Sequence, residues 1–290
     1  MGQQETTTAQ PARRPAAMFD VVMLALVVAA FAPLLVALSQ VWETVDYYAH
    51  GYLVAPVAAA MAWSRRAGPT EAEPRRDARG LVILMLAMLG YGAGLLAGLL
   101  SLQGLALPIA LAGLALWLRG ASGLRRFAFP VAYLVFMVPV PPQWLAPVVT
   151  RLQSFVTDVA ITFLVFFEVP ALREGNVIVL PEGSLFVAEA CSGITSIVTL
   201  LPVAALLAFL LPHSRRQGVV LMLSVIPVAM FWNLVRVLAT VGATRSLGVV
   251  RATSGSLHES AGLLTFVMGC LTLLAVSAWL DRLHASPRGT

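Results

Sequence analysis

Charged residues are scarce in this chain. Of its 290 residues, 11% are charged and 59% are hydrophobic, and the mean hydropathy is +0.86. Because soluble domains carry about a quarter charged residues, this composition excludes an ordinary soluble protein and indicates a polytopic membrane protein. The net charge of +5 comes from arginines spread over short loops. Nucleic-acid binding would need a clustered basic face, so no nucleic-acid partner is expected.

Cysteines are also few, and several hydrolase and nucleotide-binding patterns are missing. The two cysteines are Cys191 and Cys270. Cys191 stands at the mouth of an expected span, whereas Cys270 lies about 15 Å inside another one. A disulfide needs Cα atoms within about 7 Å, so we expect no pairing and interpret Cys270 as a small buried hydrophobe. The chain contains no CxxC, no GxSxG and no Walker loop, which argues against the corresponding redox, serine-hydrolase and P-loop chemistries.

Apolar windows of roughly 20 residues, the length that crosses a bilayer as a helix, recur along the chain. They predict an all-α polytopic membrane protein with about eight spans, at 19–40, 49–63, 80–98, 103–118, 127–139, 190–211, 217–240 and 260–280. Every second connection bears arginine: Arg13 and Arg14; Arg65, Arg66, Arg75, Arg76 and Arg79; Arg119, Arg125 and Arg126; Arg215 and Arg216; Arg282 and Arg288. By the positive-inside rule these connections face the cytoplasm, and both termini lie inside.

Residues 145–168 are long and apolar enough for a further span, but a crossing there would place Arg215 and Arg216 outside. Arg151 and Asp158 are seven residues apart, on one helical face. We therefore predict an interfacial or re-entrant helix in the outer leaflet. The predicted organisation is a cytoplasmic tail at 1–18, one transmembrane domain at 19–283 and a cytoplasmic tail at 284–290.

Three chemically suited residues come to the same outer side in this topology: Cys191, Arg236 and His258. The segment before Cys191 contains two short strand-like runs, NVIVL and SLFVA, joined by PEG, which predict an outward-facing hairpin. A thiol, a guanidinium and an imidazole can serve as nucleophile, oxyanion stabiliser and proton shuttle in acyl transfer. Arginine inside a span costs at least about 2.5–3.5 kcal/mol, so Arg236 is functional by default.

We expect the helix to begin at Cys191, where the first-turn amides of Ser192, Gly193 and Ile194 and the helix dipole would lower the thiol pKa. Gly193 would permit close approach of a substrate carbonyl. Four neighbours are candidates to contact the substrate or support the site: His50, Glu189, Asn233 and Glu259. The run HESAG has Gly262 where a zinc motif HExxH needs its second histidine, so neither a metal nor another cofactor is predicted.

The chain resembles the exosortase/archaeosortase family of membrane cysteine transpeptidases in collinear order over most of its length. The segments that carry the resemblance are YYAHGYLVAP at 47–56, FPVAYLVFMVPVP at 129–141, REGNVIVLPEG at 173–183, EACSGITS at 189–196, NLVRV at 233–237 and HESAG at 258–262. The family's active-site Cys, Arg and His fall on Cys191, Arg236 and His258.

The resemblance implies a multi-pass enzyme of the bacterial inner membrane with its active site on the periplasmic side. Its partners would be exported proteins that end in a tripartite signal: a short motif such as Pro-Glu-Pro, a transmembrane helix and a basic tail. Cleavage would pass through a thioester and end in transfer to an unidentified amine acceptor, or to water.

A different class of function also fits an intramembrane arginine. A multi-span transporter or lipid-handling protein could use Arg236 to bind an anionic substrate. Such proteins place their sites near the midplane, often between inverted repeats. We find no internal repeat here, and the polar residues gather at one face of the predicted membrane domain.

Overall fold

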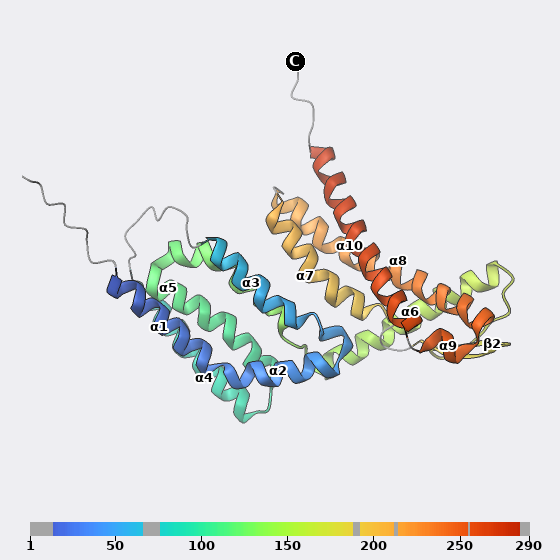
Figure 1. Cartoon of the computed structure of the whole chain (residues 1–290), viewed down its shortest axis with the longest axis horizontal. Helices are drawn as coiled ribbons and strands as arrows, with labels where there is room; N and C mark the ends of the chain where they lie inside the picture. Colours follow the sequence, from blue (N-terminus) through green and yellow to red (C-terminus); the bar gives the residue numbers. More distant parts are fainter. Residues whose placement is uncertain (1–13, 66–75, 188–191, 212–213, 255, 285–290) are drawn as a thin grey trace, which may run out of the picture. The chain divides into compact units, whose positions relative to one another are not determined.

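A computed structural model describes residues 14–65, 76–187, 192–211, 214–254 and 256–284, without the side chains of 14–17, 256–258 and 284 (Figure 1). The chain divides into two compact units. The N-terminal unit comprises Met1–Ala37 and Ala59–Val135, and the C-terminal unit comprises Leu38–Ala58 and Phe136–Thr290. The organisation of residues 19–283 as one transmembrane domain stays a prediction.

Closely packed helices make up the N-terminal unit. Helix α1 (Arg14–Ala30) is followed by α2 (Ala32–Thr44) after a bend of 51°, within the stretch predicted as one span at 19–40. From Leu38 on, α2 belongs to the C-terminal unit. Helix α4 (Ala78–Leu96) packs along α5 (Leu100–Tyr133), and the contact requires glycine. A Cβ atom on Gly80 would lie 2.2 Å from the backbone nitrogen of Trp117.

Helix α5 contains the predicted span 103–118 and reaches into the predicted span 127–139. Gly120 breaks it between the two, with φ 67° and ψ −166°. The arginines of the predicted cytoplasmic loops meet near this break. Arg119 pairs with Asp20 at 3.7 Å and lies over the ring of Phe127. Nη1 of Arg65 donates to the carbonyl of Arg126 at 3.3 Å. Three arginine-bearing segments therefore share one end of the unit.

A bundle of three helices forms the larger part of the C-terminal unit: α7 (Ile194–Leu210), α8 (Arg215–Leu247) and α10 (Ser256–His284). A short helix, α9 (Val249–Thr253), joins α8 to α10. Their shared core contains Leu200, Ala204, Leu221, Val225, Val228, Ala229, Leu273 and Leu280. Cys270 is a free thiol packed against this core, which confirms its predicted role as a small hydrophobe.

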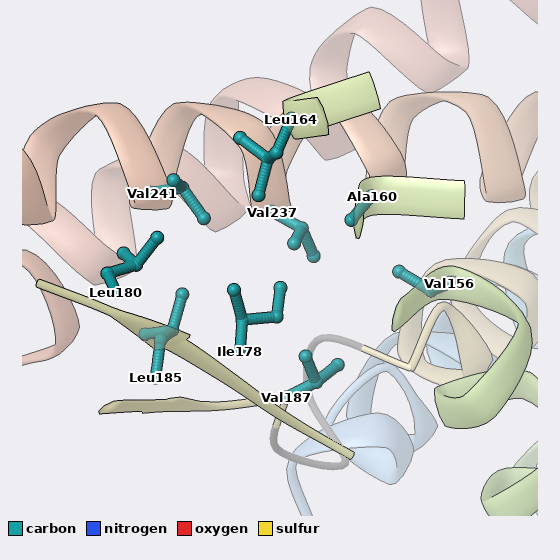
Figure 2. Close-up of a cluster of buried hydrophobic side chains, with 9 residues drawn as sticks. All are labelled: Val156, Ala160, Leu164, Ile178, Leu180, Leu185, Val187, Val237 and Val241. Atoms are coloured by element: carbon teal, nitrogen blue, oxygen red, sulfur yellow. The ribbon is translucent and has the colours of Figure 1, made fainter. Parts of the chain in front are cut away.

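A small sheet and a long helix complete this unit. Helix α6 (Pro142–Phe166) precedes β1 (Leu172–Glu174), β2 (Val177–Leu180) and β3 (Gly183–Phe186). The strands are antiparallel in the order β1-β2-β3. The predicted hairpin is thus confirmed as β2 and β3, and β1 is an addition that the sequence did not indicate. Figure 2 shows how sheet, α6 and α8 share one apolar cluster of Val156, Ala160, Leu164, Ile178, Leu180, Leu185, Val187, Val237 and Val241.

The all-α polytopic class is confirmed, but eight separate spans are not. By length and composition, five of the described helices could cross a membrane, or six if the bent pair counts as one span. Helix α3 (Gly51–Arg65) has 15 residues and α7 has 17. Both are shorter than the roughly 20 residues of a full crossing.

Candidate active site

Arg236 lies at a defined depth along α8. About 20 residues separate it from Arg216, and that length of α-helix spans about 30 Å, the thickness of a hydrocarbon core. The N-terminal end of α8 and the C-terminal end of α10 lie together, since Nε2 of Gln217 donates to the carbonyl of Leu280 at 3.2 Å. Arg236 therefore stands one hydrocarbon thickness from the arginine-bearing end of the bundle.

A buried polar stripe runs along one face of α8 and contains Asn233, Arg236, Thr240 and Thr244. The spacing of three and four residues keeps them on one side of the helix. The Thr240 hydroxyl donates to the Arg236 carbonyl, and the Thr244 hydroxyl donates to the Thr240 carbonyl, both at 2.9 Å. Arg236 is only 9% exposed, so its charge faces the protein interior.

The guanidinium of Arg236 packs against Gly262 of α10. A Cβ atom on Gly262 would lie 3.4 Å from both Cζ and Nη2 of Arg236. Gly262 is one helical turn after His258, so the two residues share a face of α10. His258 itself lies in the first turn of that helix, and its side chain is outside the described residues. The backbone thus brings the positions of Arg236 and His258 to one place.

The turn that follows Cys191 rests on the same stripe of α8. Gly193 has φ 87°, a left-handed conformation, and a Cβ atom there would lie 3.0 Å from Sδ of Met230 and 3.6 Å from Nδ2 of Asn233. Cys191 and Glu189 lie outside the described residues. Gly193 follows Cys191 by two residues in the chain.

The start of α7 differs from the prediction. The helix begins at Ile194 rather than at Cys191. The Ile194 amide donates to Oγ of the buried Ser192 at 3.2 Å, so it is not a free donor for a substrate or for the thiolate. Gly193 forms a left-handed turn in close contact with α8; the approach of a substrate carbonyl at Gly193 stays a prediction.

A buried amide network holds the chain shortly before Cys191, and the sequence analysis missed it. Nε2 of Gln153 donates to the carbonyl of Val187 at 3.2 Å, and Oε1 of Gln153 accepts from Nδ2 of Asn176 at 3.1 Å. The Val187 amide donates to the Asn176 carbonyl at 2.9 Å. A glutamine on the buried, otherwise largely apolar face of α6 was the available signal.

His50 is engaged by backbone groups. Its Nδ1 lies 3.1 Å from the carbonyl of Tyr47, and its Nε2 lies 3.0 Å from the carbonyl of Phe136. Burial lowers the pKa of His50, because desolvation disfavours the charged ring, and the two carbonyl contacts oppose this effect. These contacts anchor the turn before α3; a role of His50 toward substrate stays a prediction.

Glu259 is exposed in the first turn of α10. An acidic side chain there is favourable toward the helix dipole. Among the residues that the structure describes, no three His, Cys, Asp or Glu side chains are grouped closely enough to hold a metal ion.

Comparison with known proteins adds one finding. A family model described as transmembrane exosortase matches residues 42–275, which include the α8 stripe, the turn at Gly193 and the start of α10. No curated protein matches the chain, and no solved structure matches it.

Proposed function

Because the chain belongs to the transmembrane exosortase family, we propose that it is a membrane-embedded cysteine peptidase and transpeptidase. Its substrates are exported proteins with a C-terminal tripartite sorting signal. One observation supports this most: the buried Arg236 guanidinium lies against Gly262, one turn from His258, while Gly193, two residues from Cys191, rests on the neighbouring Asn233. These contacts support the proposal that the nucleophile, the proton shuttle and the oxyanion stabiliser lie close together.

In the proposed reaction, His258 accepts the Cys191 thiol proton, and the thiolate attacks the peptide carbonyl carbon. The carbonyl oxygen becomes an oxyanion, which the Arg236 guanidinium stabilises. Collapse breaks the peptide C–N bond, and the leaving amine takes the proton from His258. The exported protein is left as a thioester on Cys191. An amine acceptor or water then attacks this thioester and regenerates the thiol.

The surroundings of Arg236 suit an oxyanion stabiliser. In a site with little water, a fixed cation stabilises a developing negative charge more strongly than it would in solution. The guanidinium packs against Gly262, and the main-chain carbonyl of Arg236 accepts a hydrogen bond from the Thr240 hydroxyl. Arg236 is therefore preorganised, and little reorganisation is needed when the oxyanion forms.

We propose that the site opens at the outer face of the bacterial inner membrane. A three-stranded sheet has two edges with backbone groups that hydrocarbon cannot satisfy, so such a sheet lies outside the hydrocarbon core. The sheet packs on Val237 and Val241, just beyond Arg236 on α8. It also packs on Val156 and Leu164 of α6. Helix α6 is long and apolar enough to cross a membrane, and the proposal that it lies at the interface rests on the positions of the arginine-bearing connections.

Reporter fusions test this topology. Fusions after residues 70, 122, 214 and 286 are expected to give cytoplasmic signals, since they follow arginine-bearing connections. Fusions after residues 178 and 252 are expected to give periplasmic signals. A cytoplasmic signal at 178 together with a periplasmic one at 214 would contradict this topology. It would mean that α6 crosses the membrane and that the chain after α6 has the opposite orientation.

The transporter alternative receives less support from the geometry. Transporter sites lie near the bilayer midplane, whereas Arg236 lies about 30 Å along α8 from Arg216, close to the opposite boundary. Co-expression with a reporter protein that ends in the tripartite signal tests the enzyme directly. The wild-type protein should remove the transmembrane helix and basic tail from the reporter. An uncleaved reporter would instead favour the transporter alternative.

The Gly262→Val substitution is expected to slow processing by about 100-fold, because misplacing a positioned group by about 1 Å can cost that much. The added isopropyl group would displace the guanidinium, since its Cβ atom alone would lie 3.4 Å from Cζ of Arg236. The control is Leu263→Val, one residue along α10 at a side chain that is 66% exposed. Processing rates and thermal unfolding are compared; equal rates for the two variants would mean that the Gly262 contact does not position Arg236.

A further inference from the structure

The two edges of the sheet are unlike each other. β1 carries the charged Arg173 and Glu174, and Arg173 forms an ion pair with Asp158 of α6. β3 reads Gly-Ser-Leu-Phe and has no charge. Charged side chains on an edge strand discourage pairing with another chain, and their absence leaves an edge open to it. Charged side chains therefore protect only the β1 edge of the sheet against pairing with another chain.

The ladder fixes which groups of β3 face outward. The Val187 amide donates to the carbonyl of Asn176 at 2.9 Å, and Val177 is the residue opposite Phe186. In an antiparallel ladder, bonded pairs alternate along the strand. Leu185 consequently directs its amide and carbonyl to β2, while Ser184 and Phe186 direct theirs to the outer edge. Among the described residues, no strand pairs with this edge.

The strand is held rigidly from its other sides. Leu185 is buried in the cluster shared with α6 and α8, as Figure 2 shows. A Cβ atom on Gly183 would lie 2.7 Å from Cγ2 of Val249 in α9, on the face to which Leu185 points. Gln153 fixes the carbonyl of Val187. Helices thus cover the inner face of β3 and leave its outer face exposed at Ser184 and Phe186.

The direction of β3 leads into the candidate active site. The strand ends at Phe186, five residues before Cys191, and Gly193 lies against Asn233 beside Arg236. Five residues reach at most about 17 Å. A polypeptide that lies along β3 would therefore have one end close to the thiol.

We infer that the outer edge of β3 binds the substrate polypeptide as an added strand, parallel to β3, through the residues that precede the scissile bond. This inference rests on the proposed function. The added strand is parallel to β3 for the following reason. The exported part of the substrate precedes the scissile bond in the chain, and the scissile bond must lie near the C-terminal end of β3, which leads to Cys191. Main-chain hydrogen bonds to Ser184 and Phe186 supply affinity whatever the side chains are, so one edge can accept many exported proteins.

An ester scan of the substrate tests the inference on the unmodified enzyme. The synthetic peptides contain the scissile bond of the processed reporter. In each peptide, one of the eight or so backbone amides before that bond is replaced by an ester, which removes one N–H. With purified protein in lipid nanodiscs, KM should rise about threefold to tenfold at every second position and stay unchanged at the others. Such an alternation is the signature of a strand, because successive amides point to opposite sides.

The matched protein variants are Phe186→Pro, which removes an outward amide, and Phe186→Ala, which trims the side chain and keeps the amide. Phe186→Pro should raise KM about threefold to tenfold above Phe186→Ala, with the same rate of Cys191 alkylation. If the peptides are cleaved but KM changes equally at every ester position, the substrate does not bind as an added strand, and the proposed function still holds. No cleavage of any peptide by the wild-type protein would overturn both. If Phe186→Pro fails to fold, the ester scan decides alone.

Discussion

Replacing Cys191 by alanine is expected to abolish processing of the tripartite reporter. Without the thiol no thioester can form, and a positioned histidine and arginine do not supply a nucleophile. Cys191→Ser should be equally inactive, since a serine hydroxyl is far less ionised than a thiol at neutral pH. The measurement is the fraction of reporter shortened in membranes that contain equal amounts of each variant.

Cys270 is the matched control, because it is the other cysteine of the chain. It is packed against the apolar core of α7, α8 and α10, so Cys270→Ala should process the reporter normally. A membrane-impermeant thiol reagent should modify Cys191 and leave Cys270 intact. Equal processing by Cys191→Ala and the wild type would refute thiol catalysis.

Arg236→Lys is expected to slow turnover by about 100-fold to 1,000-fold, the typical cost of losing one oxyanion donor. Lysine keeps the positive charge but loses the planar fork of donors that the guanidinium offers. The variant should still be expressed and should still bind the sorting signal. Single-turnover rates and binding of the reporter are measured separately, so that a defect in chemistry is distinguished from a defect in affinity.

Arg245→Lys is the control on the same helix. Arg245 pairs with Glu182 at 3.5 Å and its side chain is 45% exposed, and exposed pairs contribute about 0–1 kcal/mol. That variant should retain near-normal turnover. If Arg236→Lys also retains it, Arg236 is removed from the catalytic set. If Arg236→Lys weakens substrate binding and no variant cleaves any protein, an anion-binding transporter fits better.

Much of the fold was predictable from local pattern. Apolar windows located the helices, and the runs NVIVL and SLFVA with their PEG connection located the β2–β3 hairpin. The third strand was missed because LRE at 172–174 is short and has no alternating pattern. The break of α5 falls at Gly120, between two windows that the sequence did separate. The family predicted from six collinear segments is confirmed by the match over residues 42–275.

Two segments that are distant in the sequence, residues 42–50 and 136–140, are joined by hydrogen bonds. Nε1 of Trp42 donates to the carbonyl of Met137 at 3.1 Å. The hydroxyl of Tyr48 accepts from the amide of Val140 at 2.7 Å. With His50, these side chains of residues 42–50 hold the backbone of residues 136–140. Such contacts span about ninety residues of sequence, and no local pattern encodes them.

The candidate site was predictable in part. Arg236 and Asn233 stand out because polar residues inside an apolar span are costly, and the structure places both on one buried stripe. Gln153 stood out as a glutamine on an apolar helix face, but its partners and the roles of Asn176 and Ser192 were not predictable. Each depends on a partner that tertiary structure or a local turn provides, and each residue type is commonly found on surfaces.

During turnover, the exported protein is expected to become attached to Cys191 through a thioester. Acid quenching during reporter turnover, followed by mass spectrometry of the protein, measures this attachment directly. We predict an adduct of the reporter on Cys191 that neutral hydroxylamine releases and that is absent from Cys191→Ala. A reporter cleaved at the normal rate by protein whose Cys191 is fully alkylated, with no adduct at any time, would contradict the account.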